Sequence, residues 1–91
     1  MSPETVQAVW NKATIVPGYN AALIRKDRCG AWIKRNDHGL RNSSYGWEVH
    51  HITPIAIGGS DTLSNLMPLH WQNNLETSNS RVIKCPVVAV S

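Results

Sequence analysis

The stretch GWEVHHITPIAIGG, residues 46–59, decides the expected fold of this chain. Apolar and polar residues alternate from Trp47 to His51, which is the pattern of a strand with one buried face. Pro54 and the pair Gly58-Gly59 interrupt regular pairing soon afterwards, so a loop follows the strand. Two adjacent histidines therefore stand where a strand runs into a loop, and their side chains point to opposite faces of that strand.

Two further elements follow this loop. NLMPL (65–69) reads as a second short strand, and Pro68 predicts that it lies at a sheet edge. HWQNNLETSN (70–79) contains no proline or glycine and has Trp71, Leu75 and Ser78 at helical spacing, so we expect a helix. The remaining residues, 80–91, are rich in β-branched side chains and predict a tail or a terminal strand.

The N-terminal third predicts two short helices. Ser2-Pro3-Glu4 combines a capping serine, a proline at the first helical position and an acid in the first turn. This first helix should end before Pro17-Gly18, which is typical of a turn. Asn20 is a candidate cap for a second helix that runs to about Arg28. We also expect a short strand at 31–33 and an irregular loop at 36–46. Together these elements predict an α+β fold.

Composition limits the classes of protein to consider. The chain has 91 residues, 42% of them hydrophobic, with four tryptophans and no phenylalanine, which suits one small globular domain. Nine Lys and Arg against six Asp and Glu give a weak bias toward polyanions such as nucleic acid. We find neither a signal peptide nor an apolar run that could span a membrane, so we expect a cytoplasmic protein. In that reducing compartment Cys29 and Cys85 should be free thiols.

Several side chains in the region from 47 to 78 are of metal-binding type. Residues four apart share a helix face, so Asn74 lies on the face of His70, whereas Asn73 does not. From spacing alone, either Asn74 or His70 remains as the partner of the histidine pair. The full set of candidates is His50, His51, Asp61, His70, Asn73 and Asn74.

The segment WEVHHITPIAIGGSDTLSNLMPLHWQNN (47–74) resembles the signature of the HNH endonucleases. CGAWIKRNDHGLRNSSYGWE (29–48) resembles the lead-in of a bacterial and phage subgroup of that family. The resemblance implies a single HNH nuclease domain over 1–91, with N-terminal helices in 1–28. The ββα-metal core would occupy 29–79, and the tail or strand would follow in 80–91.

The resemblance also implies a role for individual residues. His50 would bind a divalent cation, His51 would be the general base, and Asn65 would hold the loop by bonding backbone atoms across it. The last ligand of the pattern follows that asparagine by nine residues and is therefore Asn74. An imidazole is well suited to take a proton from water near neutral pH, and a cation can neutralise charge on a phosphate. The chain is thus expected to be a metal-dependent endonuclease.

Departures from the family pattern leave the metal open. Many relatives have aspartate where His50 stands, and its replacement by imidazole shifts preference from Mg²⁺ toward Mn²⁺, Ni²⁺ or Zn²⁺. Since the two cysteines do not form CxxC pairs, we expect no structural zinc. Glu48 lies on the strand face of His50 and is a supporting candidate. The candidates for contact with nucleic acid are Lys34, Arg35, Arg41 and Arg81.

The expected substrate is DNA, with RNA as an alternative, in a bacterial or phage-infected cell. No sequence-reading module accompanies the motif, so little sequence specificity is expected. Two other functions fit the same sequence. Thr77 stands where relatives often have lysine, which would suit a nucleic-acid-binding module with weak or no catalysis. The positive charge would also suit a toxin-type nuclease held by an acidic inhibitor.

Overall fold

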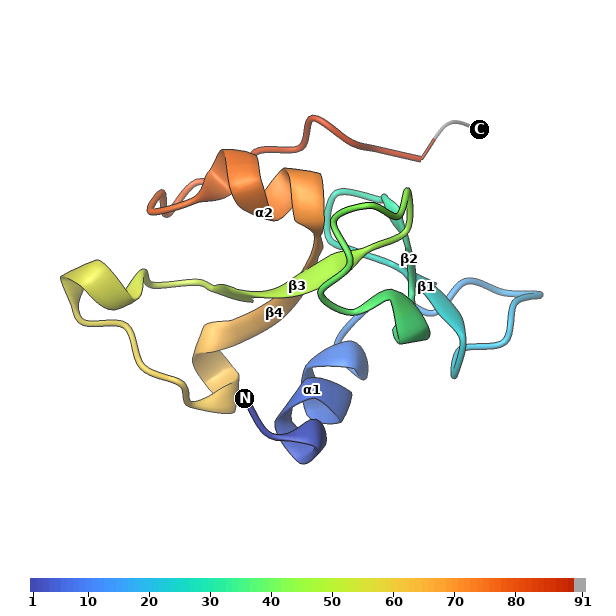
Figure 1. Ribbon diagram of the computed structural model, residues 1–91, viewed down its shortest axis with the longest axis horizontal. Helices are drawn as coiled ribbons and strands as arrows, with labels where there is room; N and C mark the ends of the chain where they lie inside the picture. The colour runs from blue at the N-terminus through green and yellow to red at the C-terminus, as the bar shows by residue number, and fades with distance from the viewer. Residues whose placement is uncertain (90–91) are drawn as a thin grey trace.

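The chain folds into two antiparallel strand pairs and two α-helices, so the expected α+β class is confirmed (Figure 1). The computed structural model describes residues 1–89. None of the helices in that range is long and apolar enough to cross a membrane. The elements in chain order are α1 (Pro3–Trp10), β1 (Ile24–Lys26), β2 (Trp32–Lys34), η1 (Arg35–Asp37), β3 (Trp47–His51), η2 (Ile55–Ile57), η3 (Leu63–Asn65), β4 (Leu66–His70) and α2 (Trp71–Thr77).

The hairpin of β3 and β4 is the centre of the fold. His50 pairs with Met67 and His51 with Leu66 in its antiparallel register. Helix α1 lies on one side of this hairpin and α2 on the other (Figure 1). Strand β3 has the predicted bounds, whereas β4 and α2 each begin one residue later than the sequence indicates. Adjacent residues of β3 therefore face different helices.

The apolar core lies between α1 and the two strand pairs. The side chain of Ser2 accepts a hydrogen bond from the Thr5 amide and caps α1, whose Val9 and Trp10 are fully buried. The rings of Trp10 and Trp47 pack with their centroids 5.4 Å apart. Such large aromatic side chains supply much of the apolar area that a small core can bury. The core therefore anchors the first residue of β3, three positions before the histidine pair.

The predicted second helix is wrong. Asn20 does cap a turn, since its side chain accepts a hydrogen bond from the Ala22 amide, but the chain then enters strand β1. Arg25 in this strand is buried and donates hydrogen bonds to the carbonyls of Asn11, Ala13 and Ala21. The strand is stabilised by its pairing with β2 and by the hydrogen bonds of Arg25 to Asn11 and Ala13. Both interactions involve residues outside the segment, and together they outweigh its helical propensity.

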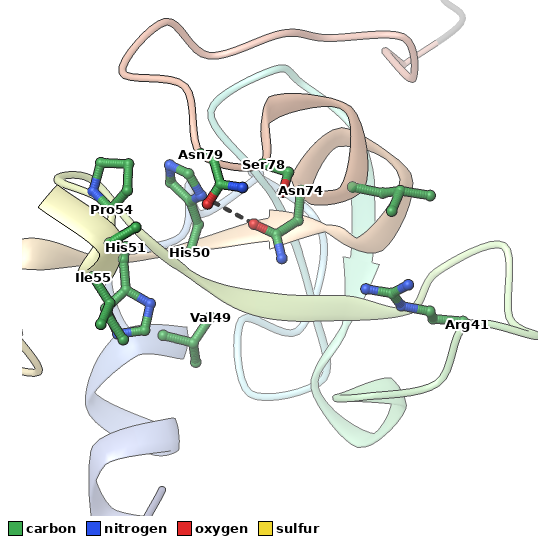
Figure 2. A pocket seen from close by; sticks show the side chains of 11 residues that line it. Arg41, Val49, His50, His51, Pro54, Ile55, Asn74, Ser78 and Asn79 are labelled. Atoms are coloured by element: carbon green, nitrogen blue, oxygen red, sulfur yellow. Dashed lines mark hydrogen bonds between the residues drawn. The ribbon is translucent and has the colours of Figure 1, made fainter. Parts of the chain in front are cut away.

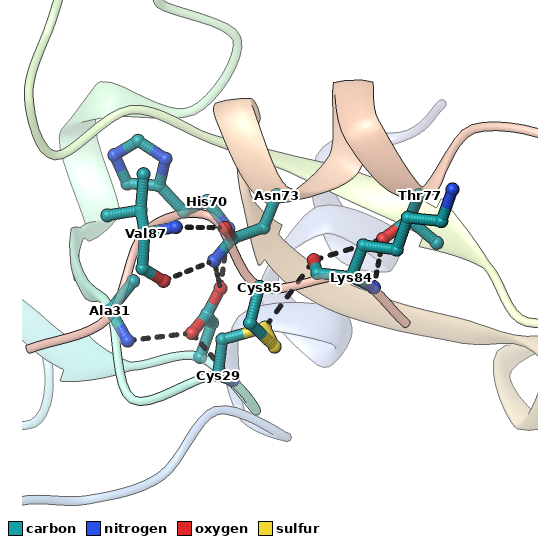
Figure 3. The surroundings of a disulfide bond; sticks show 9 residues. Cys29, Ala31, His70, Asn73, Thr77, Lys84, Cys85 and Val87 are labelled. Atoms are coloured by element: carbon teal, nitrogen blue, oxygen red, sulfur yellow. Dashed lines mark hydrogen bonds between the residues drawn. A yellow bond between two sulfur atoms is a disulfide. The ribbon is translucent and has the colours of Figure 1, made fainter. Parts of the chain in front are cut away.

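The expectation of free thiols is also wrong, because Cys29 and Cys85 form a disulfide across 56 residues (Figure 3). The turn after β1 and the C-terminal segment meet beside α2, with the two Cα atoms 5.5 Å apart. Residues 80–89 form no strand in the structure, and position 90 and beyond lie outside the described residues. The tail instead runs along the outer side of α2 (Figure 1).

Side-chain hydrogen bonds attach this tail to α2. The amide of Asn73 donates to the carbonyl of Val87 and accepts from its N–H, at 2.9 and 2.8 Å. Thr77 makes a similar pair of contacts with the backbone of Lys84. Asn73 also donates to the carboxylate of Asp27, which accepts the N–H of His70. These buried bonds hold the start of α2 against both the tail and the turn after β1.

Candidate functional site

His50 and Asn74 meet between β3 and α2 (Figure 2). His50 is 5% exposed, and its Nδ1 lies 3.0 Å from Oδ1 of Asn74. His50 lies on the side of β3 that faces α2, and Asn74 lies one turn into that helix. The fold thus brings together two residues that are 24 positions apart in the sequence. Each atom has a lone pair available to a cation when the imidazole carries its proton on the other nitrogen.

Glu48 and Arg41 fix the orientation of the Asn74 amide. The NH₂ group of Asn74 donates to Oε1 of Glu48 at 2.9 Å, so the amide oxygen is the atom that faces His50. Arg41 donates from Nε and Nη2 to the two oxygens of Glu48, at 2.7 and 3.0 Å. A bidentate guanidinium–carboxylate pair is among the most geometrically specific polar contacts. The result is a continuous chain of four side chains that ends at His50.

Protonation of both ionisable groups beside Asn74 is disfavoured. Burial is the main cause that lowers the pKa of His50, and the charge of His51 adds to it, while the bond to Asn74 acts in the opposite direction. The hydrogen bond from Arg41 is the largest cause that lowers the pKa of Glu48. A neutral imidazole next to an ionised carboxylate is the state that favours cation binding.

His51 projects from the other face of β3 and contacts Asp61. Its Nε2 lies 2.7 Å from Oδ1 of the aspartate, whose side chain is 74% exposed. A carboxylate at this nitrogen favours the tautomer in which Nε2 carries the proton. The lone pair is then on Nδ1, which Asp61 does not contact.

Asn65 joins the two ends of the loop between β3 and β4. Its side-chain oxygen accepts the N–H of Thr53, and its NH₂ group donates to the carbonyls of Thr53 and Ser60. The backbone carbonyl of Asn65 accepts the N–H of Ile52. Gly59 passes so close to Thr53 that a Cβ atom would lie 1.8 Å from its carbonyl oxygen. The loop that begins at His51 is therefore closely held.

The structure does not favour His70 as a ligand. Its Nε2 donates to the carbonyl of Ser44 and its Nδ1 accepts the N–H of Gln72, so both ring nitrogens already have partners. His70 is the N-cap of α2 rather than its first helical residue. Asn73 and Thr77 are buried against the tail, so the position where relatives often have lysine faces away from His50.

The four cations that the sequence suggested for nucleic acid do not form one patch. Lys34 lies over the ring of Tyr45, 4.4 Å from its centroid, and Arg35 donates to Gln7. Arg41 is bound to Glu48 at the edge of the candidate site. Arg81 lines a different cavity, beside the disulfide.

A cavity of about 270 Å³ opens between the two histidines and α2 (Figure 2). Arg41 lies at one end and the loop residues Pro54 and Ile55 at the other (Figure 2), and Ala56 of the same loop also lines the cavity. Its remaining walls are formed by Val49, His50, His51, Asn74, Leu75, Ser78 and Asn79. A volume of this size, lined by both polar and apolar side chains, suits a small polar group such as a phosphate.

The donor atoms of His50 and Asn74 fit one divalent cation. Two adjacent ligands of an octahedral ion, each at about 2.1 Å, lie about 3 Å apart, and Nδ1 and Oδ1 are separated by 3.0 Å. Within residues 1–89 no group of three or more His, Cys, Asp and Glu could hold a metal ion. A cation here would therefore take the rest of its coordination shell from water and substrate.

Sequence reasoning missed two pairings at this site. It considered Asp61 only as a metal ligand, and Arg41 only as a phosphate contact. The motif contains the residues but has no signal for their pairing, because Asp61 is ten residues from His51 and Arg41 seven from Glu48, each across a loop. The turn residues around Gly59 do indicate that the loop folds back toward the strand.

Residues 27–80 match the family model described as HNH endonuclease. This segment is more than half of the chain and includes β3, β4, α2 and the loop between the strands. No curated protein and no solved structure matches the chain.

Proposed function

Since the chain belongs to the HNH endonuclease family, we propose that it is a metal-dependent endonuclease that hydrolyses phosphodiester bonds in DNA. The observation that carries this proposal is the contact of His50 with Asn74 beside a second histidine, His51. The two histidines leave β3 on opposite faces. A phosphate at the strand end can therefore meet a bound cation on one side and a base on the other.

His51 is the proposed general base. Its Nε2 is held by Asp61, so Nδ1 is the nitrogen that takes a proton from the attacking water. The water oxygen bonds to phosphorus while the bond from phosphorus to the 3′-oxygen breaks, and the leaving oxygen takes its proton from solvent. A positioned base contributes about 10²- to 10⁴-fold to such a rate.

His50 and Asn74 are the proposed cation ligands. A divalent cation held by these two residues would supply Lewis-acid stabilisation of negative charge on the phosphate and the leaving oxygen. Glu48 and Arg41 keep the oxygen of Asn74 directed at His50, and Asn65 keeps the loop after His51 in place. Mg²⁺, Mn²⁺, Ni²⁺ and Zn²⁺ remain the candidate ions.

Incubation of supercoiled plasmid with the protein and each of these four ions tests the proposal. We expect nicked or linear DNA with at least one ion and intact plasmid in the presence of a chelator. His51→Ala should lose most of the activity because it removes the proposed general base. Asn36→Ala, on an exposed residue outside the site, is the control.

Two results would contradict the proposal. One is intact plasmid with all four ions, and the other is full activity of His51→Ala. The same assay on single-stranded RNA distinguishes an RNA nuclease from a DNA nuclease.

A further inference from the structure

Most cationic side chains of the protein already have a partner within the chain. Arg25, Arg35 and Arg41 donate hydrogen bonds, Lys12 donates to the carbonyls of Leu63 and Leu66, and two lysines lie over aromatic rings. Among the described residues, three cations have no such contact: Arg28, Arg81 and Lys84. The free positive charge is thus concentrated beside the C-terminal tail.

Arg28 and Arg81 line the same cavity, which has a volume of about 410 Å³. No acidic residue is among the described residues that form its wall. Ile52, Met67, Val82, Ile83 and Cys85 make up the rest of that wall. Guanidinium groups over an apolar floor suit a sugar–phosphate strand, because phosphates pair with arginine while sugars pack on apolar side chains.

The disulfide connects the two segments that carry these arginines. Arg28 directly precedes Cys29, and Arg81 precedes Cys85 in the same tail segment. Figure 3 shows the disulfide that joins the two cysteines. The turn that presents Arg28 is also fixed, since one oxygen of Asp27 accepts the N–H groups of Cys29 and Ala31. The cavity is therefore preorganised, which lowers the entropy cost of binding a ligand.

This cavity adjoins the candidate catalytic site. Met67 in its wall is the cross-strand partner of His50, and paired residues of an antiparallel sheet lie on the same face. Ile52, also in the wall, follows His51 directly. A strand with one phosphate between the histidines would have neighbouring phosphates within reach of this cavity.

We propose that Arg28 and Arg81 form a binding groove for the phosphodiester backbone of the DNA next to the bond that is cut. This inference rests on the proposed endonuclease function and adds to it the surface that holds the substrate. Neither arginine touches the reacting atoms, so the groove contributes affinity without sequence information.

Salt-dependent binding of a short fluorescein-labelled DNA duplex, measured by anisotropy in the presence of a chelator, tests the groove without cleavage. Each of Arg28→Gln and Arg81→Gln should make the plot of log Kd against log salt shallower by about 0.9, the value for one lost phosphate contact. The double variant should weaken binding by roughly 10-fold or more at low salt. Arg28→Lys and Arg81→Lys should retain most of the slope because they retain the charge.

Lys26→Gln is the matched control. It removes one positive charge only two residues from Arg28, but its ammonium group lies over the ring of Trp32, 4.6 Å from the centroid, and it is outside the cavity wall. Its slope should equal that of the wild type. Thermal unfolding of all variants checks that the fold is intact.

The outcomes separate the groove from the proposed function. Three results would each overturn the proposed groove. They are a wild-type slope for both arginine variants, no DNA binding by the wild type, and a slope change seen only with an RNA probe. If plasmid is still cut in those cases, the proposed function stands. Slope changes in a protein that cuts no plasmid support the groove and contradict the endonuclease proposal.

Discussion

A single carboxylate determines what Asn74 can do. Because Glu48 accepts the NH₂ group of that amide, the oxygen is directed at His50. Without this partner the amide could flip by 180° and direct its NH₂ group at the imidazole. The hydrogen atoms of that group would repel a cation. Glu48 therefore acts on the metal indirectly, by orienting a ligand, in the manner of the outer partners that tune metal sites.

Glu48→Gln should weaken cation binding by about 10- to 100-fold, the range for loss of such a partner. The new amide has one acceptor oxygen instead of two. If that oxygen accepts from Asn74, the NH₂ group faces Nε of Arg41 and the bidentate pair is lost. Titration calorimetry with Mn²⁺ or Ni²⁺ measures the effect independently of cleavage. Glu76→Gln, an exposed acid on α2 with no hydrogen bond to the site, is the control and should bind as the wild type does. Equal affinities of the two variants would refute this role.

Asp61→Asn should reduce the rate of cleavage by roughly 10- to 100-fold, because a base held in the wrong tautomer loses part of its contribution. Cation affinity should not change, since within residues 1–89 the side chain of Asp61 forms a hydrogen bond with His51 and with neither His50 nor Asn74. Nitrogen chemical shifts of the His51 ring report the tautomer directly, and they should move in this variant. Asp37→Asn is the control, because Asp37 bonds Ser43 away from the site. An unchanged tautomer with an unchanged rate would count against the positioning role.

Three different elements supply the side chains of the candidate site. Strand β3 separates the two histidines, helix α2 supplies Asn74, and the loop before β4 supplies Asp61. Helix α2 has only seven residues, which is too short to be stable alone. Its position depends on Asp27 and on the tail, both bonded to Asn73. The helix that carries the candidate ligand is thus held from its opposite face.

Asn65→Ala tests the loop as an element. The variant removes three side-chain hydrogen bonds and leaves the backbone groups of Thr53 and Ser60 without those partners. At about 1 kcal/mol for each bond, the free energy of unfolding should fall by roughly 1–3 kcal/mol in urea. Hydrogen exchange of the Thr53 amide should accelerate. Asn36→Ala is the control, and a loss of stability no larger than that of the control would contradict the expectation.

In the whole molecule, the disulfide links two segments that are far apart in the sequence. It joins the turn after β1 to the tail, which in turn lies on α2. A domain of 91 residues has a modest core, so a covalent link across 56 residues is a large part of its stability. The fold thereby connects the arginine groove, the tail and the helix of the candidate site.

Replacement of both cysteines, Cys29→Ser with Cys85→Ser, should lower the free energy of unfolding by about 2–4 kcal/mol, the usual contribution of a disulfide that closes a long loop. Urea unfolding measures this loss. A reducing agent should destabilise the wild type by a similar amount and leave the double variant unchanged, which is the internal control. Equal stability of oxidised and reduced wild type would show that the link contributes nothing.

Local patterns in the sequence were enough to predict the strand at β3, the loop after it and the helix after β4, and the family motif made His50, His51, Asn65 and Asn74 the candidate site residues. Alternation, turn residues and helical spacing are local signals, and the fixed spacing of a family motif extends them across the loop. Tertiary structure decided the second strand pair, where a helix was expected, because a three-residue strand is stabilised by its partner rather than by its own side chains.

Tertiary structure also decided the pairing of Asp61 with His51, of Arg41 with Glu48, and of the two cysteines. These contacts depend on how the chain returns to itself, and residues separated by a loop have no periodicity that could reveal them. The sequence therefore supplied the candidate side chains, whereas their orientation, their charge partners and the cavity lined by Arg28 and Arg81 follow from the packing of distant segments.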